Sequence, residues 1–471
     1  MIYEKSLCWL RRDLRLTDNK ALFSACKKSK QVFLVFVFDT NILNKLSNKK
    51  DQRLEFIFEA LQSINHQLKK YKSKTLILSG QPEKLIPDLC KKLNISAVFV
   101  NEDYENYAKK RDQTVKQQLN KSKISFYSFK DHILFGSDIT KKDGSAYRVF
   151  TPYKKAWLKK LQPQKHLKKH RADLTKLFLK KRPKIYKKEW QLKDLGFQKT
   201  KLKVQAGEKP AQKQLKSFSK LIKEYHINRD YPHLNKTSLL SVHLRFGTLS
   251  IRDCVKLSLK QKNKGSEIWL SELIWRDFYS MILDQFPYVE KTSFLKKYKN
   301  IKWNTSKKYF QAWCEGQTGF PIVDAGMRQL NQTGFMPNRV RMITASFLVK
   351  DLLIDWRKGE SYFAEKLLDF DLASNNGGWQ WCAGTGCDAQ PYFRIFNPIT
   401  QSQKFDPKGT YIKLWVKELK KLNKKAIHFP MAYSKKLPIN FQLGKNYPFP
   451  LVDHKLQRQK AIELFKKAPR N

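Results

Sequence analysis

The chain has 471 residues, of which 41% are hydrophobic, so it can bury a substantial core and is not disordered as a whole. Gly and Pro number only 18 each, which excludes collagen-like sequence, and the longest purely apolar run (residues 32–38) is far shorter than the ~20 residues that span a bilayer. Lys and Arg number 94 against 41 acidic residues; this net charge of +53 favours nucleic acid as a partner, although a lysine-rich proteome explains it equally well.

Residues 1–130 alternate the patterns of strands and helices. Short apolar runs predict strands at 7–10, 32–38, 75–78, 97–100 and 124–129, and apolar residues at helical spacing predict helices at 52–68, at 83–93 and up to residue 118. Such alternation is typical of an α/β domain with a mostly parallel, doubly wound sheet. The region contains no G-x-G-x-x-G, and the chain contains no G-x-x-x-x-G-K-[ST], which argues against a Rossmann dehydrogenase and a P-loop NTPase.

Residues 131–204 form a predicted interdomain connector. Within it, residues 154–203 carry 19 Lys and Arg residues against three acids, and their periodicity is poor. K-K-R-P-K at residues 180–184 has the form of a nuclear localisation signal, but a solvated linker explains this composition better. Whether this stretch contacts DNA stays open at this point.

Residues 205–471 form a predicted helical domain; the pattern is helical from about residue 213, with examples at 267–283, 321–330, 338–353 and 411–419. The predicted fold class is therefore α/β plus all-α: a doubly wound parallel-sheet domain, a long basic connector and a C-terminal all-helical domain. Seven scattered cysteines and the absence of a secretory signal indicate a reducing compartment, and we expect a cytoplasmic, nucleoid-associated protein without a membrane part. Cys382 and Cys387 lack a second pair, so no zinc site is expected.

Tryptophan is concentrated in the helical half of the chain. Because an indole needs a pocket of matching shape and a partner for its N–H, so many tryptophans in one region suggest a function beyond core packing. A well-packed core accounts for Trp313 and some of the others, and the remainder suit a planar ligand, stacked bases or an electron path. Seven of the 11 tryptophans lie in this region: Trp269, Trp275, Trp303, Trp313, Trp356, Trp379 and Trp381.

Residues 269–279 form one predicted helix whose face presents a carboxylate, a guanidinium and a phenol: Glu272, Arg276 and Tyr279. The alternative is a surface Glu–Arg pair, which contributes little to stability. A second predicted helix, which Pro337 opens, places Asn338 and the side chains three and four residues later on one face. Both faces suit a polar aromatic ligand.

Two further segments have less specific patterns. Residues 367–381 contain two acids, two Asn and two Gly before a Trp pair, which predicts a tight loop whose backbone approaches a ligand; an ordinary Asn-Gly turn is the alternative. The hydroxyls of residues 237–241 can open a helix and donate to phosphate oxygens, although simple N-capping explains them in isolation.

Several long stretches of unusual composition occur in a fixed order along the chain. They are C-W-L-R-R-D-L-R-L-T-D-N (8–19), V-F-T-P-Y-K-K-A-W-L (149–158), G-F-P-I-V-D-A-G-M-R-Q-L (319–330), M-I-T-A-S-F-L-V-K-D-L-L-I-D-W-R (342–357) and P-Y-F-R-I-F-N-P (391–398). Together they closely resemble the DNA photolyase/cryptochrome family, and within it the bacterial class I cyclobutane pyrimidine dimer photolyases. The resemblance covers nearly the whole chain.

The resemblance implies that the helical domain of residues 205–471 binds DNA and non-covalent FAD, which is bent into a U inside it and active as reduced FADH⁻. Asn375 falls at the position that faces flavin N5, and Leu239 replaces an Arg that is frequent in the family. The implied cofactor-binding residues are Tyr225, Thr237, Ser238, Leu239, Leu240, Ser241, Trp269, Glu272, Arg276, Asn338, Arg341, Asp369, Asp371 and Asn375.

The resemblance also implies that a monomer acts on UV-damaged DNA. The residues of the pocket for a flipped-out dimer, implied to be catalytic, are Glu272, Trp275, Asn338, Met342 and Trp381. Arg229, Arg339 and Gln401 are implied to grip the DNA backbone, and Arg276 and Tyr279 to contact DNA as well. Trp379, Trp356 and Trp303 match a three-tryptophan chain that carries electrons to the flavin.

Alternatives follow from the departures. Tyr107 and Ala108 stand where folate-antenna members carry Asn and Glu, so a methenyltetrahydrofolate antenna is not expected and the second chromophore stays open. A cryptochrome-type blue-light sensor shares the fold and FAD but does not repair DNA. A (6-4) photolyase is expected to place histidines around residues 338–342, and this stretch has none. A structural DNA-binding protein explains the charge but not the Trp, Asp and Asn pattern.

Overall fold

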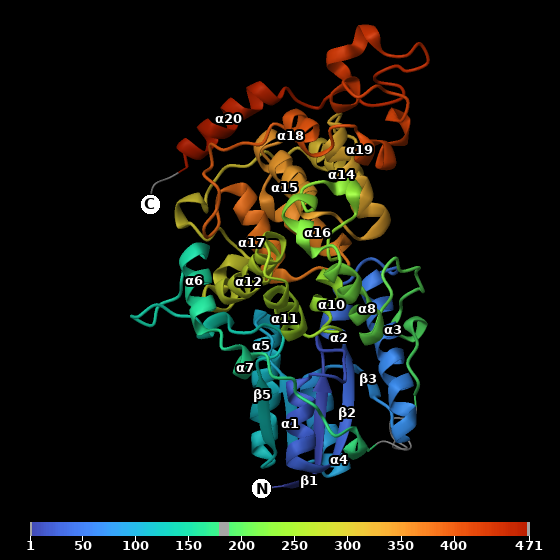
Figure 1. Ribbon diagram of the computed structural model, residues 1–471, viewed down its shortest axis with the longest axis vertical. Coiled ribbons are helices and arrows are strands. Elements are labelled where there is room, and N and C mark those ends of the chain that lie inside the picture. The colour runs from blue at the N-terminus through green and yellow to red at the C-terminus, as the bar shows by residue number, and fades with distance from the viewer. Residues whose placement is uncertain (1, 179–187, 469–471) are drawn as a thin grey trace.

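The computed structural model describes residues 2–178 and 188–468, with an α/β domain at one end and a helical domain at the other (Figure 1). The five strands of the α/β domain are parallel and follow the order β3-β2-β1-β4-β5. They are β1 (Tyr3–Leu10), β2 (Ser29–Asp39), β3 (Leu76–Gly80), β4 (Ala97–Asn101) and β5 (Ser125–Phe129). The predicted doubly wound parallel sheet is confirmed.

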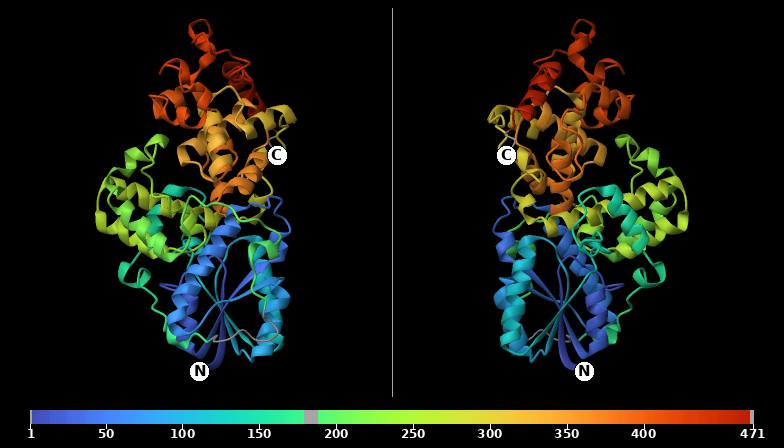
Figure 2. Two further views of the ribbon diagram at one scale, coloured as in Figure 1. Left: turned by 90° about the vertical axis from the view of Figure 1, so that its right-hand side faces the viewer. Right: turned by 90° about the vertical axis from the view of Figure 1, so that its left-hand side faces the viewer.

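Helices cover both faces of this sheet, as Figure 2 shows. Two separate apolar clusters place α1 (Lys20–Lys28) and α3 (Gln52–Leu68) over one face and α4 (Pro82–Leu93) and α5 (Asn106–Lys121) over the other. Strand β2 is buried along most of its length because a parallel strand packs under helices on both sides. Its continuous apolar run is the signature of that position.

The connector is helical at its start, so the prediction of a solvated linker from residue 154 is wrong there. Helix α6 (Phe150–Lys160) places Phe150, Tyr153 and Trp157 in a core of the helical domain. The indole N–H of Trp157 donates to Asp277 at 2.8 Å, which anchors the helix further. A short helix, α7 (Pro163–His166), follows. The basic motif at residues 180–184 lies outside the described residues.

The helical domain contains most of the remaining elements, and the all-α prediction is confirmed. The helices not yet given are α2 (Thr40–Leu43) in the α/β domain, and then α8 (Glu208–Ser219), α9 (Tyr225–Asn228), α10 (Ser241–Arg245), α11 (Ile251–Gln261), α12 (Lys264–Gln285), α13 (Lys307–Glu315), α14 (Pro321–Thr333), α15 (Asn338–Ser346), α16 (Trp356–Lys366), α17 (Leu372–Ala383), α18 (Pro398–Phe405), α19 (Thr410–Trp415) and α20 (His454–Lys466). None of the helices described is long and apolar enough to cross a membrane.

Two predicted helices end earlier than their patterns indicate. The helix expected at 338–353 continues past α15 only as a π-helical turn, η10 (Phe347–Asp351), and Leu353 has a φ of +57°. The helix expected at 411–419 stops at Trp415, because Val416 has non-helical backbone angles, and a 3₁₀ turn, η11 (Lys417–Leu419), follows. Apolar periodicity does not register either change of backbone.

The tight loop predicted within residues 367–381 is a helix. Asp371 caps α17 by accepting a hydrogen bond from the backbone N–H of Ser374 at 3.1 Å. Gly377 lies inside this helix, where an added Cβ would be 2.2 Å from the ring of Tyr279 on α12. The glycine therefore allows two helices to pack closely rather than forming a turn.

A cluster of buried ion pairs joins the two domains; we call Arg15, Asp18, Asp131 and Arg252 the structural ion cluster. Asp131 pairs with Arg15 and, at 2.5 Å, with Arg252, which also reaches Asp18 at 2.8 Å. All four side chains are at most 4% exposed. Burial alone would raise the pKa of Asp131, but the two guanidinium groups hold it below its usual value.

Replacing Asp131 should therefore destabilise the fold strongly. Asp131→Asn leaves Arg15 and Arg252 buried without their shared counter-charge, which costs about 3–5 kcal/mol in comparable buried pairs. Urea unfolding at pH 7 measures the loss. As a control, Glu4→Gln removes an exposed pair with Lys30 and should leave the free energy of unfolding nearly unchanged. Equal stability of Asp131→Asn and the parent protein would contradict the assignment.

Candidate functional site

Helix α12 presents the first group of expected site residues. The carboxylate of Glu272 accepts a hydrogen bond from Arg229 at 2.7 Å. Arg276 instead donates to the carbonyl oxygen of His132 at 2.6 Å and to its ring Nε2 at 2.5 Å. The alternative of a surface pair between Glu272 and Arg276 is therefore wrong, and each side chain reaches a partner on another element.

Trp275 and Tyr279 continue this face of α12. The indole of Trp275 stacks on Phe150 of α6, with ring centroids 3.7 Å apart and planes 6° apart. Tyr279 lies 5.2 Å from Trp275 and packs against Gly377 of α17. Trp381, on the same helix α17, is half-buried against the second core of the helical domain. The connector helix thus supports one of the two tryptophans of the expected pocket from behind.

Helix α15 brings together two residues of the expected dimer pocket. The exposed amide of Asn338 donates to the sulfur of Met342 at 3.8 Å, one turn along the helix. Arg341 forms two hydrogen bonds with the buried carboxylate of Asp369, at 2.9 and 3.0 Å. Both bonds come from Nη2 of Arg341, and its Nε donates to the carbonyl of Met336 at 2.7 Å, so α15 is tied to the segment that leads into α17.

Two of the expected DNA contacts, Arg339 and Gln401, lie at α18. Arg339 pairs with Asp230 at 2.9 Å, and its guanidinium lies 4.2 Å from the ring centroid of Phe405. On the same helix as Phe405, the amide oxygen of Gln401 is buried and has no hydrogen-bond partner among the described residues. The two cationic side chains assigned to the DNA backbone, Arg229 and Arg339, are thus ion-paired in the protein alone.

The loop before α10 has the backbone that an anion needs. Leu239 is left-handed, with a φ of +52°, and Leu240, with a φ of −93°, has the opposite hand, so successive N–H groups form a concave nest. Only Ser241 of the stretch 237–241 belongs to the helix, and the capping residue, Leu240, makes no side-chain cap bond. The hydroxyl of Ser238 accepts a hydrogen bond from the backbone N–H of Leu240 at 3.4 Å, so local capping accounts for one of these hydroxyls.

An aromatic wall and an open space complete a site that fits FAD. Phe218 contacts both Trp269 and Tyr225, with centroids 4.9 and 5.7 Å apart, so these two expected residues share one wall. On α17, a Cβ added to Gly378 would meet no atom within 4 Å, so the helix has open space one turn beyond Asn375. A pyrophosphate nest and an aromatic wall suit a dinucleotide that carries a planar ring. The residues present therefore fit the cofactor that the sequence implied.

The three tryptophans of the expected electron path lie on neighbouring segments, the first two buried and the third half-buried. Trp379 and Trp356 are 2% and 1% exposed, whereas Trp303 is half-buried. A Cβ added to Gly359 of α16 would be 2.1 Å from the Trp379 ring, so α16 and α17 are in close contact. Asn304 donates to the carbonyl of Leu353 at 2.8 Å, which places Trp303 beside the segment before α16. Trp313 is a buried core residue, as expected.

Sequence reasoning missed two residues that contact this site. The backbone carbonyl of Glu360 accepts a hydrogen bond from Asn375 at 3.0 Å, and burial raises the pKa of the Glu360 carboxyl to about 7. Arg12, in the α/β domain, pairs with Asp371, which also accepts a hydrogen bond from Tyr104 at 2.8 Å. No local pattern marks Glu360, and the motif at residues 8–19, which contains Arg12, does not indicate its partner in the helical domain.

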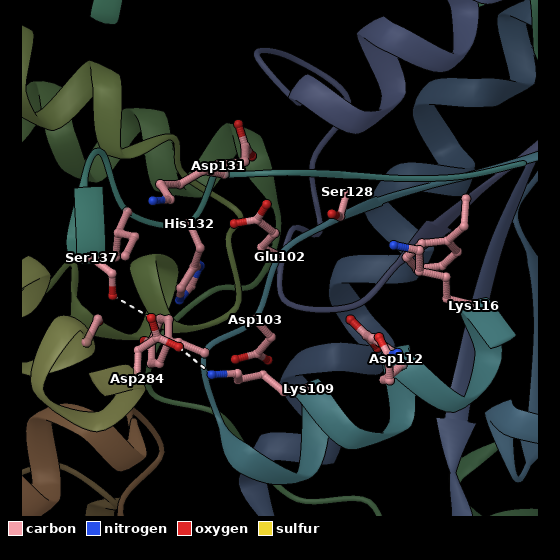
Figure 3. Close-up of a pocket in the computed structure, with 16 residues that line it drawn as sticks. Glu102, Asp103, Lys109, Asp112, Lys116, Ser128, Asp131, His132, Ser137 and Asp284 are labelled. Carbon is pink, nitrogen blue, oxygen red and sulfur yellow. Dashed lines mark hydrogen bonds and ion pairs between the residues drawn. The ribbon is translucent and has the colours of Figure 1, made fainter. Parts of the chain in front are cut away.

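A polar pocket of about 340 Å³ lies between α5, the segment after β5 and the last turns of α12 (Figure 3). Carboxylates and lysines line it, and Asp284 binds Lys109 at 2.6 Å within it. Neither Tyr107 nor Ala108 lines this pocket; the Tyr107 hydroxyl donates to Asp39 at 2.7 Å. None of the residues expected to hold FAD lines it, so it is separate from the predicted site.

Two family models match the chain: the FAD binding domain of DNA photolyase over residues 269–467, and DNA photolyase over residues 6–190. The chain is 39% identical to the deoxyribodipyrimidine photo-lyase of Vibrio cholerae, over 98% of its own length and 99% of that protein. Its structure is similar to a bacterial class III photolyase from Agrobacterium tumefaciens, with a TM-score of 0.89, 34% identity and coverage of 99% and 98% of the two chains. It is also similar to a Synechocystis cryptochrome, with a TM-score of 0.85, 28% identity and coverage of 98% and 99%.

The raised pKa of Glu360 predicts a pH-dependent stability. Its pKa in the folded protein, about 7, exceeds the ordinary 4.5, so its stabilising contribution is complete below pH 4.5 and is lost as the pH rises through 7. Because glutamine does not ionise, Glu360→Gln keeps its stability over this range. Its free energy of unfolding relative to that of the parent should rise by about 3 kcal/mol between pH 4.5 and pH 8. Urea unfolding of the cofactor-free proteins at both pH values measures this difference.

The matched control is Glu365→Gln, on the exposed side of the same helix. Its stability relative to the parent should be the same at both pH values. Parallel pH profiles for Glu360→Gln and the parent would show that Glu360 ionises normally.

Proposed function

Because the chain belongs to the DNA photolyase family, we propose that it is a light-dependent DNA repair enzyme, a deoxyribodipyrimidine photo-lyase that splits cyclobutane pyrimidine dimers in UV-damaged DNA. The observation that carries this proposal is a division of burial within one site. Tyr225, Trp269 and Asp371 are buried where FAD would lie, whereas Glu272 and Asn338 are accessible, the former with 31% of its side chain exposed. A buried cofactor wall below an accessible polar and aromatic rim suits a cofactor that acts on a large ligand.

The arrangement suits a flipped-out pair of fused bases. Trp275 and Trp381 would flank the bases, while Glu272 and Asn338 would form hydrogen bonds with their polar edges. Flipping costs less at a dimer that is already poorly stacked and paired, which provides part of the selectivity for damage. When bound, reduced FADH⁻ supplies under blue or near-UV light an electron that opens the cyclobutane ring and then returns. The chain's own residues orient the dimer and stabilise the charge that develops on it.

DNA binding would exchange ion pairs within the protein for contacts with phosphates. Arg229 and Arg339 are paired with Glu272 and Asp230, and each pair is partly exposed. A phosphate can therefore replace an acid at either guanidinium without opening a buried cluster. The net charge of +53 favours this exchange through release of counterions from DNA, so affinity should fall steeply with salt.

Within the family, we propose class I rather than class III, on the motifs quoted above, and a monomer as the active form. The alternative function is a cryptochrome-type blue-light sensor, which the likeness to the Synechocystis protein favours. Illumination of the purified, reduced protein with dimer-containing oligothymidine separates the two. Recovery of thymine absorbance supports repair, a protein that photoreduces but leaves dimers intact supports the sensor, and failure to bind FAD contradicts both.

Glu272→Ala should reduce discrimination in favour of the dimer by ~10- to 100-fold, because a charge-assisted hydrogen bond to the bases is lost. FAD should remain bound. Affinity for undamaged DNA should stay equal or rise, because Arg229 loses its acidic partner. Binding titrations with damaged and undamaged duplexes measure both effects. Glu267→Ala, an exposed substitution on the same helix, is the control; unchanged discrimination in Glu272→Ala would remove Glu272 from the pocket.

Trp303→Phe should slow photoreduction of the oxidised protein, because a phenyl ring is much harder to oxidise than an indole. Repair by protein that has been chemically reduced beforehand should be unaffected. Absorbance during continuous illumination with an external thiol measures the first effect, and the oligothymidine assay measures the second. Trp415→Phe, on α19, is the control and should photoreduce normally. Equal rates for Trp303→Phe and the parent would show that electrons enter elsewhere.

A further inference from the structure

We propose that Arg12, in the α/β domain, is a positioning residue of the FAD site in the helical domain. This inference rests on the proposed function only in that FAD is the ligand. Arg12 lies two residues beyond the end of β1, and its guanidinium contacts side chains of both domains. Within its own domain it donates to Asp103 at 3.1 Å and to Glu105 at 2.8 Å. We call Arg12, Asp103, Glu105, His132 and Asp371 the positioning cluster.

The first link to the FAD site runs through Asp371. One carboxylate oxygen of Asp371 caps α17 by accepting from the N–H of Ser374, and the other accepts from Arg12 and Tyr104. Burial would raise the pKa of Asp371, but Arg12 and neighbouring arginines hold it far below its usual range, so the carboxylate stays charged. Arg12 therefore defines where α17 begins, and that helix carries Asn375 and two of the functional tryptophans.

The second link runs through His132. Its ring Nε2 faces Arg12 at 2.8 Å and Arg276 of α12 at 2.5 Å. Burial, together with these two cations, lowers the pKa of His132 well below its usual value, so the ring is neutral and its Nε2 accepts hydrogen bonds from both. Arg276, expected at the cofactor, is thus held by a histidine that Arg12 also holds. His132 and Asp103 also line the polar pocket described above (Figure 3).

The structural ion cluster at the same interface shows that ionic contact between the domains does not by itself reach the FAD site. Arg15 is more deeply buried than Arg12, with 2% against 13% of its side chain exposed. Its polar contacts are with Asp131 and with the backbone carbonyls of Asp18 and Gly247. None of these residues is expected at FAD. Arg15 is therefore a matched control for the loss of a buried guanidinium.

The test compares Arg12→Met, Arg12→Lys and Arg15→Met. The dissociation constant of FAD is measured by equilibrium dialysis at a temperature at which circular dichroism shows each protein to be folded. Arg12→Met should raise it by ~10- to 100-fold, because charge-assisted hydrogen bonds that orient two FAD-site residues are lost. Arg12→Lys should raise it less, since a lysine keeps the charge without the planar fork. Arg15→Met should change it by less than ~2-fold while lowering stability at least as much.

A second measurement does not depend on the cofactor. In the cofactor-free protein, amide hydrogen exchange at Ser374 and Asn375 should be faster in Arg12→Met than in Arg15→Met, because the start of α17 loses its anchor. If Arg12→Met does not fold, Tyr104→Phe removes one hydrogen bond to Asp371 and should raise the FAD dissociation constant several-fold.

An unchanged dissociation constant in the Arg12 variants, or an equal rise in Arg15→Met, would overturn this inference and leave the proposed function intact. A parent protein that binds no FAD would instead overturn the proposed function.

Discussion

The ion pair between Arg12 and Asp371 connects the α/β domain to the helical domain. It joins the end of strand β1 to the start of α17. Arg12 follows strand β1, which lies beside β4 at the point where the strand order of the sheet reverses. Open α/β sheets usually receive a ligand at this edge. In this protein the helical domain packs against this edge. Arg12, which lies there, is paired with the acidic side chains of Asp103, Glu105 and Asp371 instead of with a ligand. A buried guanidinium needs acidic partners, so the geometry of these ion pairs specifies the relative position of the domains.

A division of labour between neighbouring side chains on the same helices follows from that arrangement. On α12, Trp269 faces the interior, Arg276 turns to the domain interface, and Glu272 stays accessible. On α17, Trp379 is buried while Trp381 is half-buried. The 3.6-residue period of a helix points these side chains in different directions, so a single helix presents both buried and accessible candidate site residues.

The arginines of this protein form two kinds of ion pair, buried ones between the domains and partly exposed ones at the rim. In the structural ion cluster, arginines are matched by acids and hold the domains together. At the rim, Arg229 and Arg339 are also matched, but their pairs remain partly exposed. Partly exposed pairs contribute little to stability and can be exchanged for phosphate, whereas buried pairs cannot. Burial thus separates the arginines that hold the domains together from those that are accessible to an anion in solution.

Local patterns in the sequence determined the fold class, the parallel sheet and several long helices, because apolar periodicity and capping depend on residues a few positions apart. They also identified candidate site residues on α12 and α15, where a functional face repeats every three or four residues.

The tertiary structure alone decided what depends on distant segments. The sequence around Gly377 has the pattern of a turn, and only the contact with Tyr279 of α12 explains the glycine. The sequence of α6 has the pattern of a linker, and only the folded structure shows its three aromatic side chains in a core. Arg12 is one of 94 Lys and Arg residues, and the residues adjacent to it in the sequence do not indicate that its partner is Asp371. Pairing of charges across domains depends on the folded path of the whole chain, so local sequence contains no signal for it.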